Sequence, residues 1–271
     1  YAVLLYALIK NDDSGLLNNP NGLRYLKRLF KTGDATVVEE IKNDNPTLQI
    51  MTHNILQSSK LLFDTFDSLM KMIVMVRHPV YMAEHWFNYI DRVGIDLREF
   101  TLTTGENGDI PWFASGIKNY LSMKPMDKVI YGIKALMDMQ DNILSEMDET
   151  RKKQILLIPF ESFVLDPHKW IKKSTQLLET EDTRITYKVL KKQKCPRVKI
   201  HAGKGHSSYG FDKNLIQLSE EEDYNRRLTF IHEKATPKAI NILNDLSQRY
   251  MENYDFPRKM PWEASHVHSN T

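Results

Sequence analysis

Residues 72–89 combine a short apolar run, a proline and an amphipathic pattern, and together these restrict the possible folds strongly. The five apolar residues 72–76 are typical of a strand covered on both faces. Residues 77–79, Arg-His-Pro, end the strand, and the apolar spacing after them predicts a helix over residues 80–89. An arginine at the carboxyl end of a buried strand, beside the free N–H groups of a helix N-terminus, is typical of a phosphate site.

Composition narrows the class of protein. The chain has 271 residues, 41% hydrophobic and 27% charged, which indicates an ordinary globular protein. A net charge of +2 argues against a strongly basic nucleic-acid binder, although it permits a local basic pocket. The single cysteine, Cys195, excludes an intrachain disulfide and a cysteine-built zinc site, and it fits a reducing compartment, so a cytoplasmic location is expected. The apolar runs are all shorter than the roughly 20 residues of a membrane span, and the scattered histidines predict no metal site.

Short apolar runs alternate with helical patterns along the chain. Strands are predicted at residues 48–51, 72–76 and 155–158. Short strands that alternate with helices imply an α/β fold with a mainly parallel sheet. The predicted helices cover residues 3–9 and 126–147, a helix opened by Asp166-Pro167, one opened by a Ser219–Glu222 capping box, and one opened by Thr236-Pro237, whereas residues 105–111 read as a surface loop.

The residues that follow each predicted strand carry the functional signal. A pair of polar or aromatic residues follows each predicted strand with no more than one intervening residue: Thr52-His53, Arg77-His78 and Phe160-Glu161. In parallel sheets, ligands bind outside the carboxyl ends of the strands. A candidate base, a phosphate-binding arginine and an aromatic ring are therefore expected to converge on one edge.

This arrangement resembles the sulfotransferase family, whose members use 3′-phosphoadenosine-5′-phosphosulfate (PAPS). The resemblance places Arg77 on the 3′-phosphate of the nucleotide, together with His85, which stands where the family usually has a serine. It makes His53 the general base that deprotonates the acceptor, although Met51 stands where many members have a lysine.

Later segments extend the resemblance over about residues 1–215. Phe160 falls where an aromatic ring packs near the adenine, and Glu161 is expected to hydrogen-bond loop backbone. Lys204 and Gly205 resemble the Lys-Gly loop over the 3′-phosphate, with Gly203 in place of the usual arginine. Trp112 and Phe113 fall in a region that lines the acceptor pocket.

The resemblance implies a P-loop-NTPase-like parallel sheet flanked by helices, the sulfotransferase fold, and a reaction that moves a sulfuryl group from PAPS to a hydroxyl or amine. It implies 3′,5′-diphosphoadenosine as product and a small-molecule or glycan acceptor. We expect one domain over residues 1–259 and a disordered tail over residues 260–271. The family's N-terminal strand and 5′-phosphosulfate loop are not found, so the sequence is expected to begin just after that loop.

Other interpretations remain open. Arg77 could merely pair with a surface carboxylate, His53 could be structural while a carboxylate acts as base, and Phe160 could be a core residue. Trp112 and Phe113 could anchor a loop. The whole chain could be a non-catalytic nucleotide-binding or interaction protein on the same fold, or a P-loop nucleotide kinase, although no Walker A loop is visible. The basic residues of segment 191–199 form either a solvated face or a guide for an anionic cofactor.

Overall fold

The computed structural model describes residues 53–92, 101–200 and 218–254, all within the compact unit His53–Thr271. The predicted strand 48–51, the predicted helix 3–9 and the tail 260–271 lie outside the described residues. The single-domain boundary at residue 259 therefore stays a prediction.

Two parallel strands form the sheet that positions the candidate site. Strand β1 (Met72–Val76) pairs with β4 (Ile155–Pro159) in a register that runs from Met72 opposite Ile155 to Val76 opposite Pro159. Both predicted strands and their parallel pairing are confirmed. The expectation that both faces of β1 are covered is wrong, because burial alternates along the strand and Ile73 and Met75 are 39% and 47% exposed.

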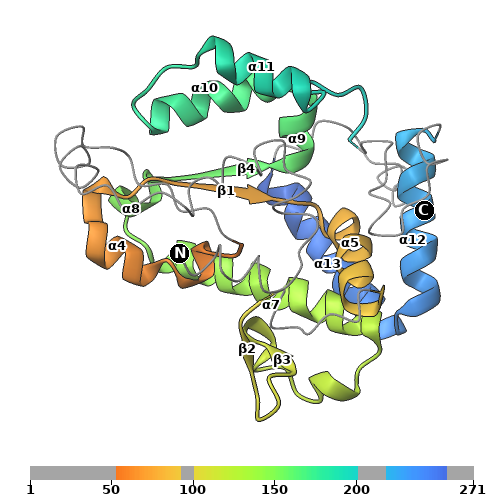
Figure 1. The fold of residues 1–271 in the computed structure, drawn as a ribbon. Coiled ribbons are helices and arrows are strands. Elements are labelled where there is room, and N and C mark those ends of the chain that lie inside the picture. Colours follow the sequence, from red (N-terminus) through yellow and green to blue (C-terminus); the bar gives the residue numbers. More distant parts are fainter. Residues whose placement is uncertain (1–52, 93–100, 201–217, 255–271) are drawn as a thin grey trace, which may run out of the picture. The chain divides into compact units, whose positions relative to one another are not determined.

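Helices flank the sheet, and Figure 1 shows the long helix α7 on the opposite side of β1 from α10 and α11. The strand ends of β1 and β4 each lead into a helix, α5 (Pro79–Arg92) and α9 (Phe160–Leu165). The remaining α-helices are α4 (Lys60–Phe66), α7 (Pro125–Glu146), α8 (Glu149–Lys152), α10 (Pro167–Leu177), α11 (Arg184–Lys192), α12 (Glu220–Lys234) and α13 (Pro237–Asn253); four short 3-10 helices are η1 (Leu56–Ser58), η2 (Asp67–Leu69), η3 (Trp112–Ala114) and η4 (Tyr120–Ser122).

The predicted helix starts are confirmed by their caps. The Asp166 side chain accepts from the N–H of Lys169, and Ser219 and Glu222 form a reciprocal capping box at α12. Thr236 caps α13, whose first residue is a proline. Local sequence therefore sets where these helices begin.

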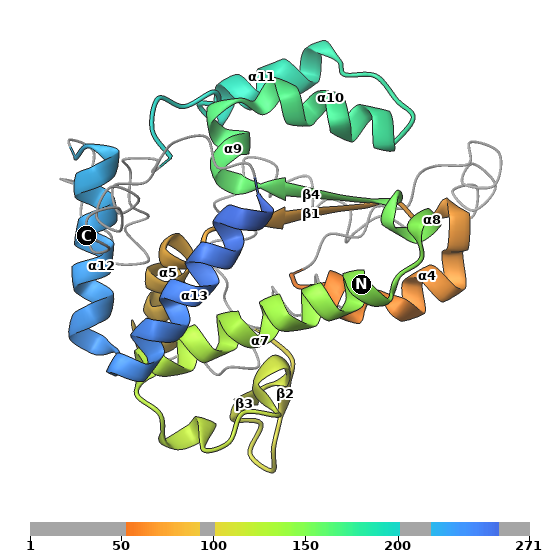
Figure 2. The same ribbon diagram turned by 180° about the vertical axis from the view of Figure 1, so that it is seen from behind.

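The main core lies where α5, α7, α12 and α13 meet. Its fully buried side chains include Val80, Ile130, Ile133 and Leu243. Burial of a side chain of this size is worth about 1.5–3 kcal/mol, so this packing holds the start of α5 firmly at the end of β1. Figure 2 shows the same arrangement from behind, with α13 between α7 and the strand ends.

The predicted surface loop is confirmed for residues 105–109, which connect two strands. Residues 110–111 differ from the prediction, since β3 (Ile110–Pro111) pairs antiparallel with β2 (Thr103–Thr104). Gly105 and Gly108 take φ values of 89° and 65°, which permit the tight turn. Helices α4, α9 and α11 were missed because they are only seven, six and nine residues long, too short for a clear helical period.

Across the described ranges, each helix is too short or too polar to cross a membrane.

Candidate anion-binding site

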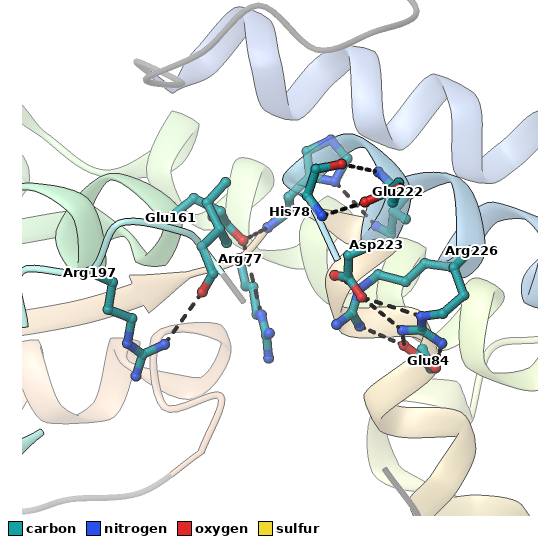
Figure 3. Close-up of polar contacts among 12 residues, drawn as sticks. Arg77, His78, Glu84, Glu161, Arg197, Glu222, Asp223 and Arg226 are labelled. Atoms are coloured by element: carbon teal, nitrogen blue, oxygen red, sulfur yellow. Dashed lines mark hydrogen bonds and ion pairs between the residues drawn. The ribbon is translucent and has the colours of Figure 1, made fainter. Parts of the chain in front are cut away.

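Arg77 and Phe160 meet at the carboxyl ends of the two strands, as predicted from the sequence. Val76 lies opposite Pro159, so the residues that follow them emerge side by side. The guanidinium carbon of Arg77 lies 4.9 Å from the centroid of the Phe160 ring. Its Nε lies 4.0 Å from Oε1 of Glu161 (Figure 3). The aromatic ring and the carboxylate together restrict the orientation of the Arg77 guanidinium group.

Glu161 is fully buried in the corner, the name used for residues 77–78 and 160–161 at the two strand ends, and it bonds to groups on both sides. Its Oε1 accepts a hydrogen bond from the backbone N–H of His78 at 3.1 Å, and its Oε2 accepts from the Tyr250 hydroxyl at 2.7 Å. The predicted bond from Glu161 to loop backbone is thus confirmed. Burial raises the pKa of Glu161, while the Tyr250 hydroxyl and the charge of Arg77 oppose the rise.

His78 is the second buried group of the corner. Its Nδ1 accepts from the N–H of Val80 at 3.3 Å, and its ring meets those of Tyr81, Tyr224 and Tyr250 edge-on at 5.3–6.2 Å. Burial lowers its pKa to about 3, so the ring is neutral at pH 7.

The expectation that α5 offers free N–H groups at its start is therefore wrong in part. The N–H of His78 is held by Glu161 and that of Val80 by the His78 ring. Burial explains this, because a buried N–H group without an acceptor is costly. Any anion at this corner would depend mainly on side-chain donors.

Acidification is expected to destabilise the protein through His78. The unfolded histidine protonates below its ordinary pKa of about 6.5, whereas the buried ring stays neutral down to about 3. The unfolded state therefore binds more protons in this window, and stability falls as pH drops through it; from pH 7 to pH 5 this residue costs about 2 kcal/mol. A His78→Asn variant keeps an amide oxygen that can accept from Val80. Urea unfolding should show that its free energy of unfolding falls between pH 7 and pH 5 by about 2 kcal/mol less than that of the parent protein.

The exposed His232 supplies the matched control. His232→Asn should keep the pH dependence of the parent protein. If His78→Asn also kept it, His78 would not be the group responsible.

His85 lies two turns into α5 from Arg77. Burial, followed by the charges of Arg77 and Arg227, lowers its pKa to about 4. The charge of Arg77 therefore acts on the His85 ring, and the predicted share of His85 in phosphate binding stays a prediction. A neutral imidazole offers one N–H donor and no charge.

A buried ion network joins α5 to α12 beside this corner. Arg226 holds both carboxylate oxygens of Glu84 at 2.7 and 2.9 Å (Figure 3). Arg227 bridges Glu84 at 2.6 Å and Asp223 at 2.7 Å. Burial alone would raise the pKa of Asp223, but the two arginines hold it below its usual range. The sequence analysis missed this network, because no spacing rule links residues 84 and 226.

One N–H group of Arg77 donates no hydrogen bond within the described ranges. Its Nε is buried and has no hydrogen-bond partner within the described ranges, while the side chain as a whole is 32% exposed. Arg197, seen in the sequence only as part of a basic run, adds a second cation 5.8 Å from the centroid of the same Phe160 ring. The site therefore places two guanidinium groups around one aromatic ring, although Nη1 of Arg197 also donates to the Ile200 carbonyl at 3.4 Å.

The other predicted site residues are not brought to this corner by any contact among the described residues. His53 is exposed, and the strand predicted before it is outside the described residues, as are Lys204 and Gly205. Phe113 is only 3% exposed and packs against Trp86 and Gly132, while Trp112 is partly buried beside it. The two views agree that α7 lies between this hairpin region and the sheet (Figures 1 and 2).

Comparison with known proteins found no matching family model, no matching curated protein and no matching solved structure.

Proposed function

We propose that the protein is a PAPS-dependent sulfotransferase that moves a sulfuryl group to a hydroxyl or amine acceptor. The observation that carries the proposal is Arg77, a partly exposed arginine with a hydrogen-bond donor left unpaired within the described ranges, at the carboxyl end of a parallel strand. Ligands of parallel sheets bind at such ends. The sequence resemblance assigns this same arginine to the 3′-phosphate of the cofactor.

The donor set fits a nucleotide phosphate. Arg77 supplies a planar fork of N–H groups that matches phosphate oxygens, and the sequence resemblance assigns His85 to the same phosphate. Phe160 lies within cation–π distance of two guanidinium groups at the same edge, and the sequence resemblance assigns this ring to packing near the adenine.

PAPS supplies the reactive sulfur when bound. The protein's part is to orient the nucleotide and to take the acceptor proton. Arg77 would hold the 3′-phosphate, and Glu161 would keep Arg77 and the loop at His78 in place. His53, which is exposed, would accept the proton from the acceptor. The resemblance assigns Lys204 and Gly205, which lie outside the described residues, to the same phosphate.

The same corner would serve a non-catalytic nucleotide-binding protein. The histidine at position 85, in place of the family's serine, favours this second candidate. Binding of 3′,5′-diphosphoadenosine without turnover of PAPS would distinguish it from the enzyme.

Arg77→Ala is expected to weaken binding of 3′,5′-diphosphoadenosine by about 10- to 150-fold. Loss of a hydrogen bond to a charged group costs about 1.5–3 kcal/mol, which gives this range. Isothermal calorimetry measures it, and adenosine 5′-phosphate should lose far less affinity because it lacks the 3′-phosphate.

Arg151→Ala is the matched control, since its side chain is also 32% exposed and pairs with Asp64 on another part of the unit. It should leave nucleotide affinity unchanged. Equal affinity in the Arg77 variant and the parent protein would refute the 3′-phosphate assignment.

A further inference from the structure

Residues 166–199, which include α10 and α11 and are called here the basic hairpin, concentrate positive charge. They hold ten lysine and arginine residues against four aspartate and glutamate residues, a formal charge of +6. The whole chain carries only +2, so the remainder is net negative by four charges. Figures 1 and 2 show α10 and α11 together on the side of β4 that faces away from α7.

Helix α11 presents apolar side chains within this charge. Leu190 is its one buried residue, whereas Ile185 and Val189 are 70% and 51% exposed. Positions 185 and 189 are one turn apart and share a face of the helix. The exposed side chains of Arg184, Lys188 and Lys192 flank them. A single exposed aliphatic residue is ordinary, but a pair surrounded by cations is a distinct surface.

We propose that the basic hairpin docks on an anionic lipid membrane through α11. Lysine and arginine side chains are attracted to anionic head groups, and adjacent aliphatic side chains gain free energy when they enter the boundary with the acyl chains. A polyanionic glycan is the weaker fit, because its hydroxyl and sulfate groups offer nothing to Ile185 and Val189.

The expected binding is shallow and reversible. Two aliphatic side chains bury little area, so the charges must supply most of the attraction, and this part is screened by salt. Binding should therefore need anionic lipid and should weaken as the ionic strength rises.

Sedimentation with vesicles tests the proposal. Phosphatidylcholine vesicles containing about 30% phosphatidylserine should carry the protein down at about 0.1 M salt, and vesicles of phosphatidylcholine alone should not. Lys188→Glu with Lys192→Glu should weaken binding by at least about tenfold. Ile185→Ser with Val189→Ser should weaken it severalfold at unchanged charge.

The exposed lysines Lys118 and Lys238, which lie outside the basic hairpin, provide the control. Reversal of both to glutamate should change vesicle binding much less than reversal on α11. All variants alter exposed side chains, and thermal unfolding should confirm that each is folded.

Three outcomes would overturn the proposal. These are no sedimentation with anionic vesicles, an equal effect of the control pair, and full binding by the Ile185 and Val189 variant. Retention on heparin without any vesicle binding would assign the surface to a glycan instead. None of these results bears on nucleotide binding at Arg77, so the proposed function would stand or fall separately.

Discussion

Replacement of His53 by alanine is expected to lower turnover by about 10²–10⁴-fold while nucleotide affinity stays the same. This is the range for loss of a general base, which removes the acceptor proton in the transition state. Release of 3′,5′-diphosphoadenosine from PAPS, followed with a panel of phenol, amine and glycan acceptors, measures turnover in the full-length protein. Because only a neutral imidazole can accept the proton, activity should also fall in acid.

The exposed His232 offers a matched substitution. His232→Ala should keep both turnover and nucleotide affinity. Turnover near that of the parent protein in His53→Ala would contradict the assignment. A carboxylate base would then be indicated by activity that persists to lower pH.

Arg227→Met is expected to destabilise the protein by about 3–5 kcal/mol. The substitution roughly keeps the side chain's bulk but removes the charge that Glu84 and Asp223 share, and these carboxylates are only 5% and 1% exposed. Without Arg227, the two buried carboxylates share the single charge of Arg226, so one buried negative charge loses its cation, and this is the source of the cost. Urea unfolding at pH 7 measures the free energy of unfolding.

Lys152→Met is the control for an ion pair at the surface. Lys152 pairs with Glu149 at 2.9 Å, and their side chains are 37% and 79% exposed. Exposed pairs are worth about 0–1 kcal/mol, so this variant should lose little stability. A similar loss in both variants would show that the network beside the site contributes no more than a surface pair.

Local rules explain what could be predicted from the sequence. Apolar runs and helix caps depend on neighbouring residues, so β1, β4 and the starts of α10, α12 and α13 were all visible. The meeting of Arg77 with Phe160 also followed, because parallel strands end at one edge. Only the coarse α/β architecture is established in this way; the sulfotransferase fold stays a proposal.

Contacts between distant residues could not be predicted. The bonds from Arg226 to Glu84 and from Tyr250 to Glu161 join residues 142 and 89 positions apart. No periodicity in the sequence encodes such a partner. The burial of His78 was missed for the same reason, since its covering rings come from α5, α12 and α13.

The bond between Tyr250 and Glu161 cannot form until late in synthesis of the chain. Synthesis adds about 5–20 residues per second, so roughly 4–18 s separate the two residues at the ribosome. During that interval the newly made β1, β4 and α9 have no Tyr250 hydroxyl for the Glu161 carboxylate. A nascent chain halted before Tyr250 could thus satisfy this carboxylate through the backbone N–H of His78 but not through the hydroxyl.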